Sequence, residues 1–244
     1  MFKTPHEAVV FAKEFRVAVK DVTGVEIVVA PPFTAVHAVA EALRNTNVGV
    51  AAQNLYWERE GAFTGEVSGP MIKDAGAEYV IIGHSERRRL FGDTDEGVNK
   101  KVFAALAAGL GPIVCVGETL DEREKNETFA VIDRQVREGL KGLTSAQVAD
   151  LVVAYEPVWA IGTGLTATPE IAQLTCADIR GILAERFDAA TAESCRIQYG
   201  GSANAENAAS LVGQPDVDGL LVGGAALQAE AFTKICQAAA AVAS

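Results

Sequence analysis

The stretch Tyr79–Arg88, YVIIGHSERR, decides the fold because it passes from a short apolar run through one glycine into a charged helical start. The run has the length and β-branched content of a strand, and the same order of strand, turn and helix recurs along the chain. These runs are nearly free of charged residues, as strands buried on both faces of a parallel sheet are. They are Val25–Ala30, Val48–Gln53, Tyr79–Gly83, Pro112–Gly117, Leu151–Glu156, Arg196–Gly200 and Gly219–Gly223.

Amphipathic segments with helical periodicity lie between the strand-like runs. Several carry start signals, for example Thr168-Pro169, which places proline at the first helical position. No linker, low-complexity stretch or charge run interrupts the alternation, so residues 1–244 are predicted to form one α/β domain. The helical segments are Thr34–Leu43, Asp95–Ala108, Glu127–Leu140, Pro169–Phe187, Ala205–Val212 and Gln228–Val242.

The chain opens on a helix rather than a strand. Residues Thr4 to about Phe15 have helical periodicity, and Thr4-Pro5 marks their start. In a strict alternation this helix follows a strand, so we expect a (β/α)8 barrel without its first strand, with seven strands and eight helices. An open, doubly wound sheet that begins with a helix is the alternative. It is less favoured because the evenly spaced units lack a dinucleotide-type glycine-rich first turn.

Length and composition fit such a barrel. Barrels of this kind often fill about 250 residues as one domain, and this chain has 244 residues, 49% of them hydrophobic. The net charge of −11 argues against nucleic acid or an anionic membrane as partner, since both favour basic surfaces. An anionic ligand must therefore be held by local groups.

The sequence also indicates the compartment. The longest charge-free stretch, residues 102–117, contains Gly and Pro and is shorter than the roughly 20 residues that a membrane span needs. The first residues lack the pattern of a secretory signal. The cysteines have no C-x-x-C spacing, so zinc sites and disulfides are disfavoured and a reducing cytoplasm is expected.

Polar residues stand at the ends of several strand-like runs, where barrels of this kind carry their reactive groups. His84 follows a strand and starts a helical turn, which disfavours protonation and predicts a neutral imidazole able to donate to an oxygen. Glu156 ends an apolar run and precedes a proline, so it is a candidate general base. Glu118 has the same position, with a structural role as the alternative. Asn54 ends the second run.

Glycines shape the connections after the later strands. The uncharged segment Pro157–Thr168 has Gly162 and Gly164 near its middle and suits a lid that excludes water, although it could be an ordinary connection. Gly200-Gly201-Ser202 and Gly223-Gly224 each close a strand before a helix. Glycine pairs also serve ordinary tight turns, but on the last two strands they match the usual phosphate site of these barrels.

Three other chemistries have less support from the same positions. No strand-like run carries a lysine, so Schiff-base chemistry is disfavoured. A metal site formed by His84, Glu118 and Glu156 would lack a second His or an Asp. No Ser-His-acid grouping is evident at the strand ends.

Several motifs together resemble the triosephosphate isomerase family, from Phe2 to about Ala238. They are Ala52-Gln53-Asn54, GAFTGE at 61–66, IGHSERR at 82–88, VCVGE at 114–118, AYEPVWAIGTG at 154–164, YGGS at 199–202 and LVGG at 221–224. The resemblance implies a TIM-type barrel, a triose phosphate substrate, a place in glycolysis and gluconeogenesis, and neither cofactor nor metal.

The resemblance also implies roles for individual residues. Glu156 would move a proton between two carbons of the substrate, and neutral His84 would polarise the oxygens of the enediolate. Trp159 and Glu118 resemble the hinge contact of the lid, and Tyr199 with Ser202 would receive the closed lid. The residues implied for phosphate binding are Gly162, Ser202, Gly223 and Gly224.

The family also implies a homodimer, because the segment Gln53–Ser68, centred on Thr64, resembles a loop that inserts into a partner subunit. A departure at the start of the chain argues against it. The family opens with a strand ending in Asn-x-Lys, and Met1-Phe2-Lys3-Thr4 matches the residues directly after that motif. Without that strand and its loop, the partner pocket for Thr64 would be incomplete.

The same departure bears on activity. The catalytic lysine and asparagine have no counterpart in this sequence, and Lys3 falls at the helix entrance, three residues too late to replace the lysine. Glu86, which resembles the carboxylate that pairs with the lysine, would be unpaired, and its pKa would rise if it were buried. We expect strongly reduced isomerase activity, with an inactive phosphate-binding barrel or scaffold as the alternative. The runs Val25–Ala30 and Gly219–Gly223 would expose sheet edges.

Overall fold

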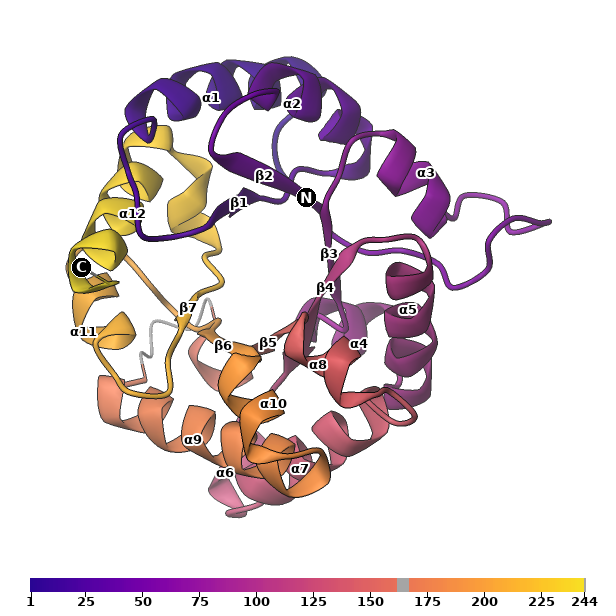
Figure 1. The fold of residues 1–244 in the computed structure, drawn as a ribbon, viewed down its shortest axis with the longest axis vertical. Helices are drawn as coiled ribbons and strands as arrows, with labels where there is room; N and C mark the ends of the chain where they lie inside the picture. The colour runs from indigo at the N-terminus through magenta and orange to yellow at the C-terminus, as the bar shows by residue number, and fades with distance from the viewer. Residues whose placement is uncertain (162–166, 244) are drawn as a thin grey trace.

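Seven parallel strands form one curled sheet in the computed structural model, which describes residues 1–161 and 167–243 (Figure 1). The strands pair in sequence order from β1 to β7. A doubly wound sheet reverses its strand order at a switch point, so the sequential order rules out that alternative and confirms the barrel prediction. The strands are β1 (Ile27–Val29), β2 (Val48–Ala52), β3 (Tyr79–Ile82), β4 (Gly111–Val116), β5 (Val152–Tyr155), β6 (Arg196–Tyr199) and β7 (Gly219–Leu220).

The helices that the sequence predicts lie outside the sheet, close to the predicted positions (Figure 1). Local chemistry fixes their starts. At the start of α1, Thr4 and Glu7 form a capping box and Pro5 is the first helical residue. At the start of α9, the Thr168 hydroxyl accepts from the Ile171 amide. These helices are α1 (Pro5–Ala18), α2 (Val36–Leu43), α5 (Asp95–Ala107), α7 (Thr128–Gly139), α9 (Pro169–Arg186), α11 (Ala208–Val212) and α12 (Ala229–Ala243).

The predicted number of eight helices is wrong, because the described part of the chain contains twelve α-helices. The additional ones are five to seven residues long, too short for a periodic apolar face to show in the sequence. Capping boxes at Thr119 and Thr144 start two of them. The short helices are α3 (Gly69–Asp74), α4 (Ser85–Phe91), α6 (Leu120–Glu124), α8 (Ser145–Ala149) and α10 (Ala189–Ser194); 3-10 turns are η1 (Phe33–Ala35), η2 (Val158–Ala160) and η3 (Gly224–Leu227).

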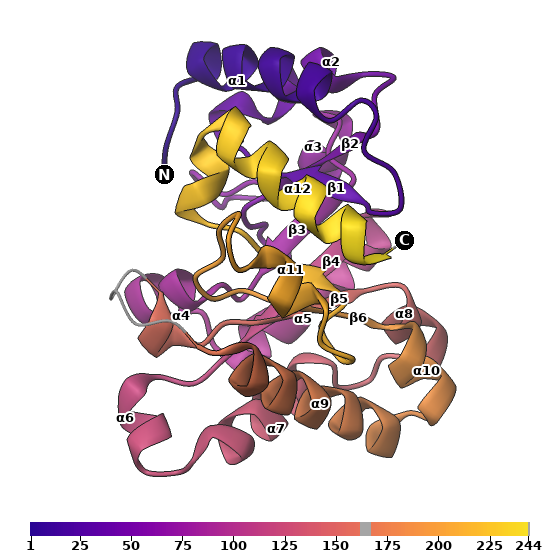
Figure 2. The same cartoon turned by 90° about the vertical axis from the view of Figure 1, so that its left-hand side faces the viewer.

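The sheet has a seam between its outer strands. Within the described ranges β1 and β7 do not pair with each other, and both are only partly buried, whereas β4 and β5 are almost wholly buried. The helix layer is continuous over the seam, because α1 packs against both α2 and α12 (Figure 2). Stacked rings fill this junction, with Phe15 lying 4.9 Å from Phe232 and 5.4 Å from Phe11 between ring centroids.

Alternate strand residues form two apolar cores. Val80 and Ile82 belong to the large core between sheet and helices, while Ile81 belongs to a small cluster on the opposite face, inside the ring. That inner cluster consists of Ile81, Ile113, Cys115, Val152 and Ala154. The two faces therefore account for strands that are apolar throughout. In the described residues, none of the helices is long and apolar enough to cross a membrane.

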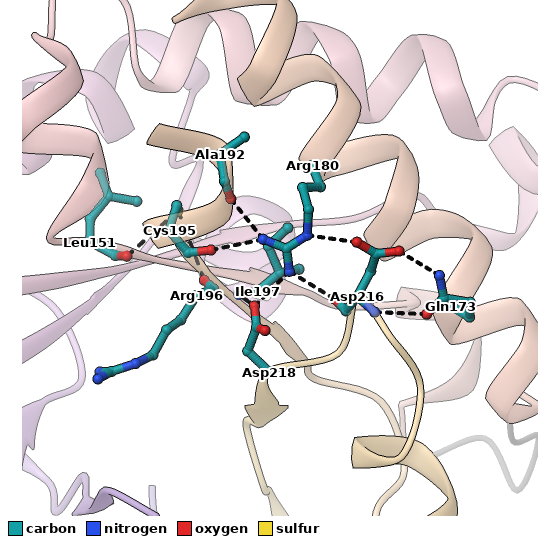
Figure 3. Close-up of polar contacts among 9 residues, drawn as sticks. All are labelled: Leu151, Gln173, Arg180, Ala192, Cys195, Arg196, Ile197, Asp216 and Asp218. Atoms are coloured by element: carbon teal, nitrogen blue, oxygen red, sulfur yellow. Dashed lines mark hydrogen bonds and ion pairs between the residues drawn. The ribbon is translucent and has the colours of Figure 1, made fainter. Parts of the chain in front are cut away.

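A charged network ties α9 to the amino ends of β6 and β7, opposite the strand ends that carry the candidate site (Figure 3). The Arg180 guanidinium, 15% exposed, contacts Asp216 Oδ1 at 2.6 Å and Asp218 Oδ2 at 2.7 Å. It also donates to the Ala192 carbonyl at 2.7 Å and the Cys195 carbonyl at 3.3 Å. One side chain thus joins α9 to the segments on both sides of β6.

Arg180→Met leaves two carboxylates without their partner, so we expect it to lower the free energy of unfolding by about 3 kcal/mol, measured in urea. Arg137→Met removes an arginine whose ion pairs lie nearer the solvent and serves as the control, with a much smaller expected loss. Equal losses in the two variants would contradict the role of this network.

Candidate active site

The turn after β3 places His84 at the start of α4. Gly83 has a φ of 72°, in the left-handed region, and a Cβ there would lie 2.7 Å from Val98 Cγ2, so the position requires glycine. His84 is the N-cap of α4, and its Nδ1 accepts from the Glu86 amide at 3.3 Å. Its Nε2 remains available on the other side of the ring.

Glu156 reaches the same place from the end of β5. Its amide donates to the Val116 carbonyl at 2.7 Å, which extends the pairing of β5 with β4 by one residue. Gly117 allows this close approach, because a Cβ there would lie 1.8 Å from the Glu156 carbonyl oxygen. The Glu156 side chain is 2% exposed.

The Glu156 carboxylate contacts both residues at the start of α4, His84 and Ser85. Its Oε1 lies 3.0 Å from His84 Nε2. The Ser85 amide donates to Oε2 at 2.9 Å, and the Ser85 hydroxyl donates to Oε1 at 3.1 Å. The two strand-end residues singled out in the sequence are therefore in direct contact. Ser85 was not predicted, although its place in the first turn of a helix leaves its amide free to bind an anion.

Two features act on the protonation of His84 in opposite directions. Its Nδ1 accepts from the Glu86 amide, and a ring nitrogen accepts only when it is unprotonated, as in the expected neutral imidazole. Burial lowers the pKa of His84, but the hydrogen bond to Glu156 and its negative charge outweigh burial, and the pKa is raised above 6.5. Glu86 contributes in the same direction. The helix N-terminus, on which the prediction rested, is opposed by a carboxylate 3.0 Å away. The described residues thus pair an imidazole with a carboxylate.

Glu118 joins the end of β4 to the segment after Glu156. It is fully buried, and its Oε1 accepts from Trp159 Nε1 at 2.8 Å, from the Tyr155 hydroxyl at 3.2 Å and from Arg123 Nη1 at 3.1 Å. The Arg123 guanidinium also lies over the Trp159 ring, 4.4 Å from its centroid. The contact between Glu118 and Trp159 anchors the first part of the proposed lid segment. Gly162 and the middle of that segment lie outside the described residues.

The two glycine pairs have different surroundings. A Cβ at Gly201 would lie 2.1 Å from the Tyr199 hydroxyl, and one at Gly200 would lie 3.0 Å from Glu156 Cγ, so this pair gives space to side chains. Gly223 and Gly224 have nothing within 4 Å of a Cβ built on them, and both are exposed. The turn that they form is thus the open one, as a phosphate site needs.

Several predicted residues lie at the edge of the site or away from it. Ser202 is exposed at the turn after β6. Tyr199 is fully buried. Glu86 is exposed and is therefore not a buried carboxylate. The Lys3 ammonium lies 5.2 Å from the centroid of the Phe11 ring on α1.

Thr64 is exposed in the loop between β2 and α3, which extends away from the body of the molecule (Figure 1). A buried lysine fixes the base of this loop. Lys101, 3% exposed, donates to Asn54 Oδ1 at 2.9 Å and contacts Asp93 Oδ2 at 2.7 Å. The sequence singled out Asn54 but not Lys101, because a lysine on a helix usually faces solvent.

The side chains of His84 and Glu156 lack a positively charged neighbour of the kind that anion-binding sites often have. Among the described residues, no lysine or arginine side chain contacts Glu156 or His84. No group of three or more His, Cys, Asp or Glu side chains suited to a metal ion is found in the described ranges.

Comparison with known proteins identifies the family. The family model described as triosephosphate isomerase matches residues 1–239. This chain belongs to the triosephosphate isomerase family. A relative of that name from Carboxydothermus hydrogenoformans is 54% identical over 96% of this chain and 94% of its own length. One from Moorella thermoacetica is 60% identical over 86% of this chain and 84% of its own length.

A solved triosephosphate isomerase has the same fold. The crystal structure of the Bartonella henselae protein has a TM-score of 0.88 and 34% identity, and the match covers 98% of this chain and 94% of that one. The expected TIM-type barrel class is therefore confirmed, with seven strands in the described part of the sheet.

The contact between His84 and Glu156 predicts a pH dependence. Because the pKa of His84 is raised, the protonated pair stabilises the fold fully below about pH 6.5, and this contribution is lost as the pH rises through the folded-state pKa. In Glu156→Gln the charge is gone and burial dominates, so we expect the pKa of His84 to fall. Titration of the imidazole by NMR measures both values; an unchanged pKa in Glu156→Gln would refute the pairing.

Proposed function

We propose that this chain interconverts dihydroxyacetone phosphate and glyceraldehyde 3-phosphate by proton transfer through an enediolate. The observation that carries the proposal is the buried Glu156 carboxylate, held by Ser85 and His84 at the carboxyl ends of the strands. A carboxylate in that place can remove a proton from one substrate carbon and return it to the next. The His84 imidazole can donate to the substrate oxygens, which carry the developing charge.

The substrate phosphate is proposed to bind at the open turn after β7. Gly223 and Gly224 form that turn, and Ser202 lies in the turn after the neighbouring strand β6. Backbone amides at a turn of this kind bind anions without a side-chain cation. Gly162 is proposed as a further donor by resemblance, and it lies outside the described residues.

We propose that turnover by this chain is slow. The substrate carries about two negative charges at neutral pH, yet within the described residues the Glu156 and His84 side chains contact no lysine or arginine. Loss of one oxyanion donor costs about 10²–10³ in rate, and loss of a cation that also holds phosphate costs more. The substrate oxygens would depend on His84 and on backbone amides.

A coupled assay of glyceraldehyde 3-phosphate isomerisation tests the rate. We expect turnover at least about a hundredfold below that of the Moorella thermoacetica relative measured alongside. Glu156→Gln should remove the remaining activity, because an amide cannot accept the proton.

Three outcomes would contradict these expectations. Turnover equal to that of the relative would show that the cation is supplied or is not needed. An unaffected rate in Glu156→Gln would show that another group is the base. Binding of a triose phosphate without any turnover would favour the alternative of a phosphate-binding barrel.

We also propose a homodimer formed through the loop that carries Thr64. Exposed apolar side chains support this, since Phe63 in the loop is 40% exposed, and Leu90 and Phe91 on α4 are 61% and 67% exposed. The loop and α4 both adjoin the proposed site, because Asn54 and His84 sit at the ends of neighbouring strands. The partner's copy of the loop would cover this apolar surface.

Light scattering should give twice the chain mass for the unmodified protein and the single-chain mass for Thr64→Arg, whose charge would have to be buried at the interface. Thr23→Arg changes an exposed threonine in the connection between α1 and β1 and is the control, expected to leave the mass unchanged. A single-chain mass for the unmodified protein would refute the dimer.

The reaction proposed here belongs to glycolysis and gluconeogenesis, and we infer that the protein acts in the cytoplasm. The four cysteines support a reducing compartment, because all are free and buried. A proton transfer of this type needs no cofactor.

A further inference from the structure

One arginine of α4 bonds the backbone directly before His84 and the backbone of β4, the strand that pairs with the segment carrying Glu156. The Arg88 side chain is 17% exposed. Its Nε donates to the Gly83 carbonyl at 2.8 Å and its Nη2 to the Cys115 carbonyl at 3.3 Å. Its Nη1 contacts Asp95 Oδ1 at 2.6 Å, which holds the guanidinium from the start of α5.

The two carbonyls flank the site from different strands. Gly83 directly precedes His84 and is in the left-handed conformation that aims the chain into α4. Cys115 directly precedes Val116, whose carbonyl accepts from the Glu156 amide at 2.7 Å. One guanidinium therefore bonds the end of β3 that presents the imidazole and the end of β4 that pairs with the backbone of Glu156.

We propose that Arg88 is a positioning residue that sets the placement of His84 relative to Glu156. This inference rests on the proposed function for its effect on rate, but not for its effect on the geometry of the pair. Arg88 contacts neither reacting group. It acts through the backbone at Gly83 and Cys115.

The planar guanidinium suits this task better than an ammonium would. Its N–H groups point in fixed directions in one plane, so three acceptors from three elements are held at set angles. The space is tight, because a Cβ at Gly83 would lie 3.2 Å from Arg88 Nη2 and 3.4 Å from the Cys115 carbonyl oxygen. A lysine keeps the positive charge but cannot hold all three acceptors in one plane.

The test compares Arg88→Lys with the control Arg134→Gln. Arg134 contacts the other oxygen of Asp95 at 2.7 Å and is 56% exposed, so its loss disturbs the anchor without touching either carbonyl. We expect Arg88→Lys to lower kcat by about 10- to 100-fold with KM within about twofold, because small misplacement of reacting groups costs about that much. Arg134→Gln should keep both constants within about twofold.

A second measurement reads the pair directly and needs no turnover. The chain has three histidines, so the ring nitrogens of His84 can be followed by ¹⁵N NMR. We expect Arg88→Lys to shift the His84 signals and to broaden them by exchange as the contact with Glu156 loosens, while His6 and His37 stay as in the unmodified protein.

The outcomes separate the two claims. His84 signals and kcat in Arg88→Lys that match those of Arg134→Gln would overturn the positioning role. Shifted His84 signals in a chain without detectable isomerisation would refute the proposed function while supporting the positioning role. A lowered melting temperature with unshifted His84 signals would also overturn it, because the arginine would then only stabilise the fold.

Discussion

The hydrogen bond from the Glu156 amide to the Val116 carbonyl is the interaction on which the site depends. It continues the β5–β4 ladder one residue past the strand, and it delivers a carboxylate into a buried position at the strand end. Gly117 makes the approach possible, since any larger residue would collide with the Glu156 backbone. Ser85 and His84 then bind the carboxylate, so sheet register rather than a loop conformation brings the residues together.

Much of this arrangement could be predicted because parallel strands are coded locally. The apolar runs gave strand positions within a few residues, and their carboxyl ends singled out His84 and Glu156. Contacts that depend on distant segments could not be predicted. Ser85 looks like an ordinary helix start, and Lys101 looks like a surface lysine until β2 brings Asn54 against it. Short helices were missed because a capping box such as Thr119 with Glu122 contributes few residues to any periodic pattern.

Electrostatics limits what the described site can do. The imidazole and the carboxylate contact each other, which raises the pKa of His84, and the turn at Gly223 and Gly224, proposed above to bind phosphate, is open. The chain belongs to the triosephosphate isomerase family, and a carboxylate beside an imidazole suits the proton transfer proposed for it. At the seam between β1 and β7, the outer strands of the sheet, the packing of α1 against α2 and α12 continues the helix layer.

Solvent exchange during turnover tests the proposed role of Glu156 as the base, because a carboxylate that holds the substrate proton can exchange it with water. Dihydroxyacetone phosphate is converted in D₂O, and deuterium at the carbon that gains the proton is measured by NMR. We expect a measurable fraction of the glyceraldehyde 3-phosphate molecules to carry deuterium. Product formed without any deuterium would contradict proton transfer through the solvent-exchangeable carboxylate of Glu156.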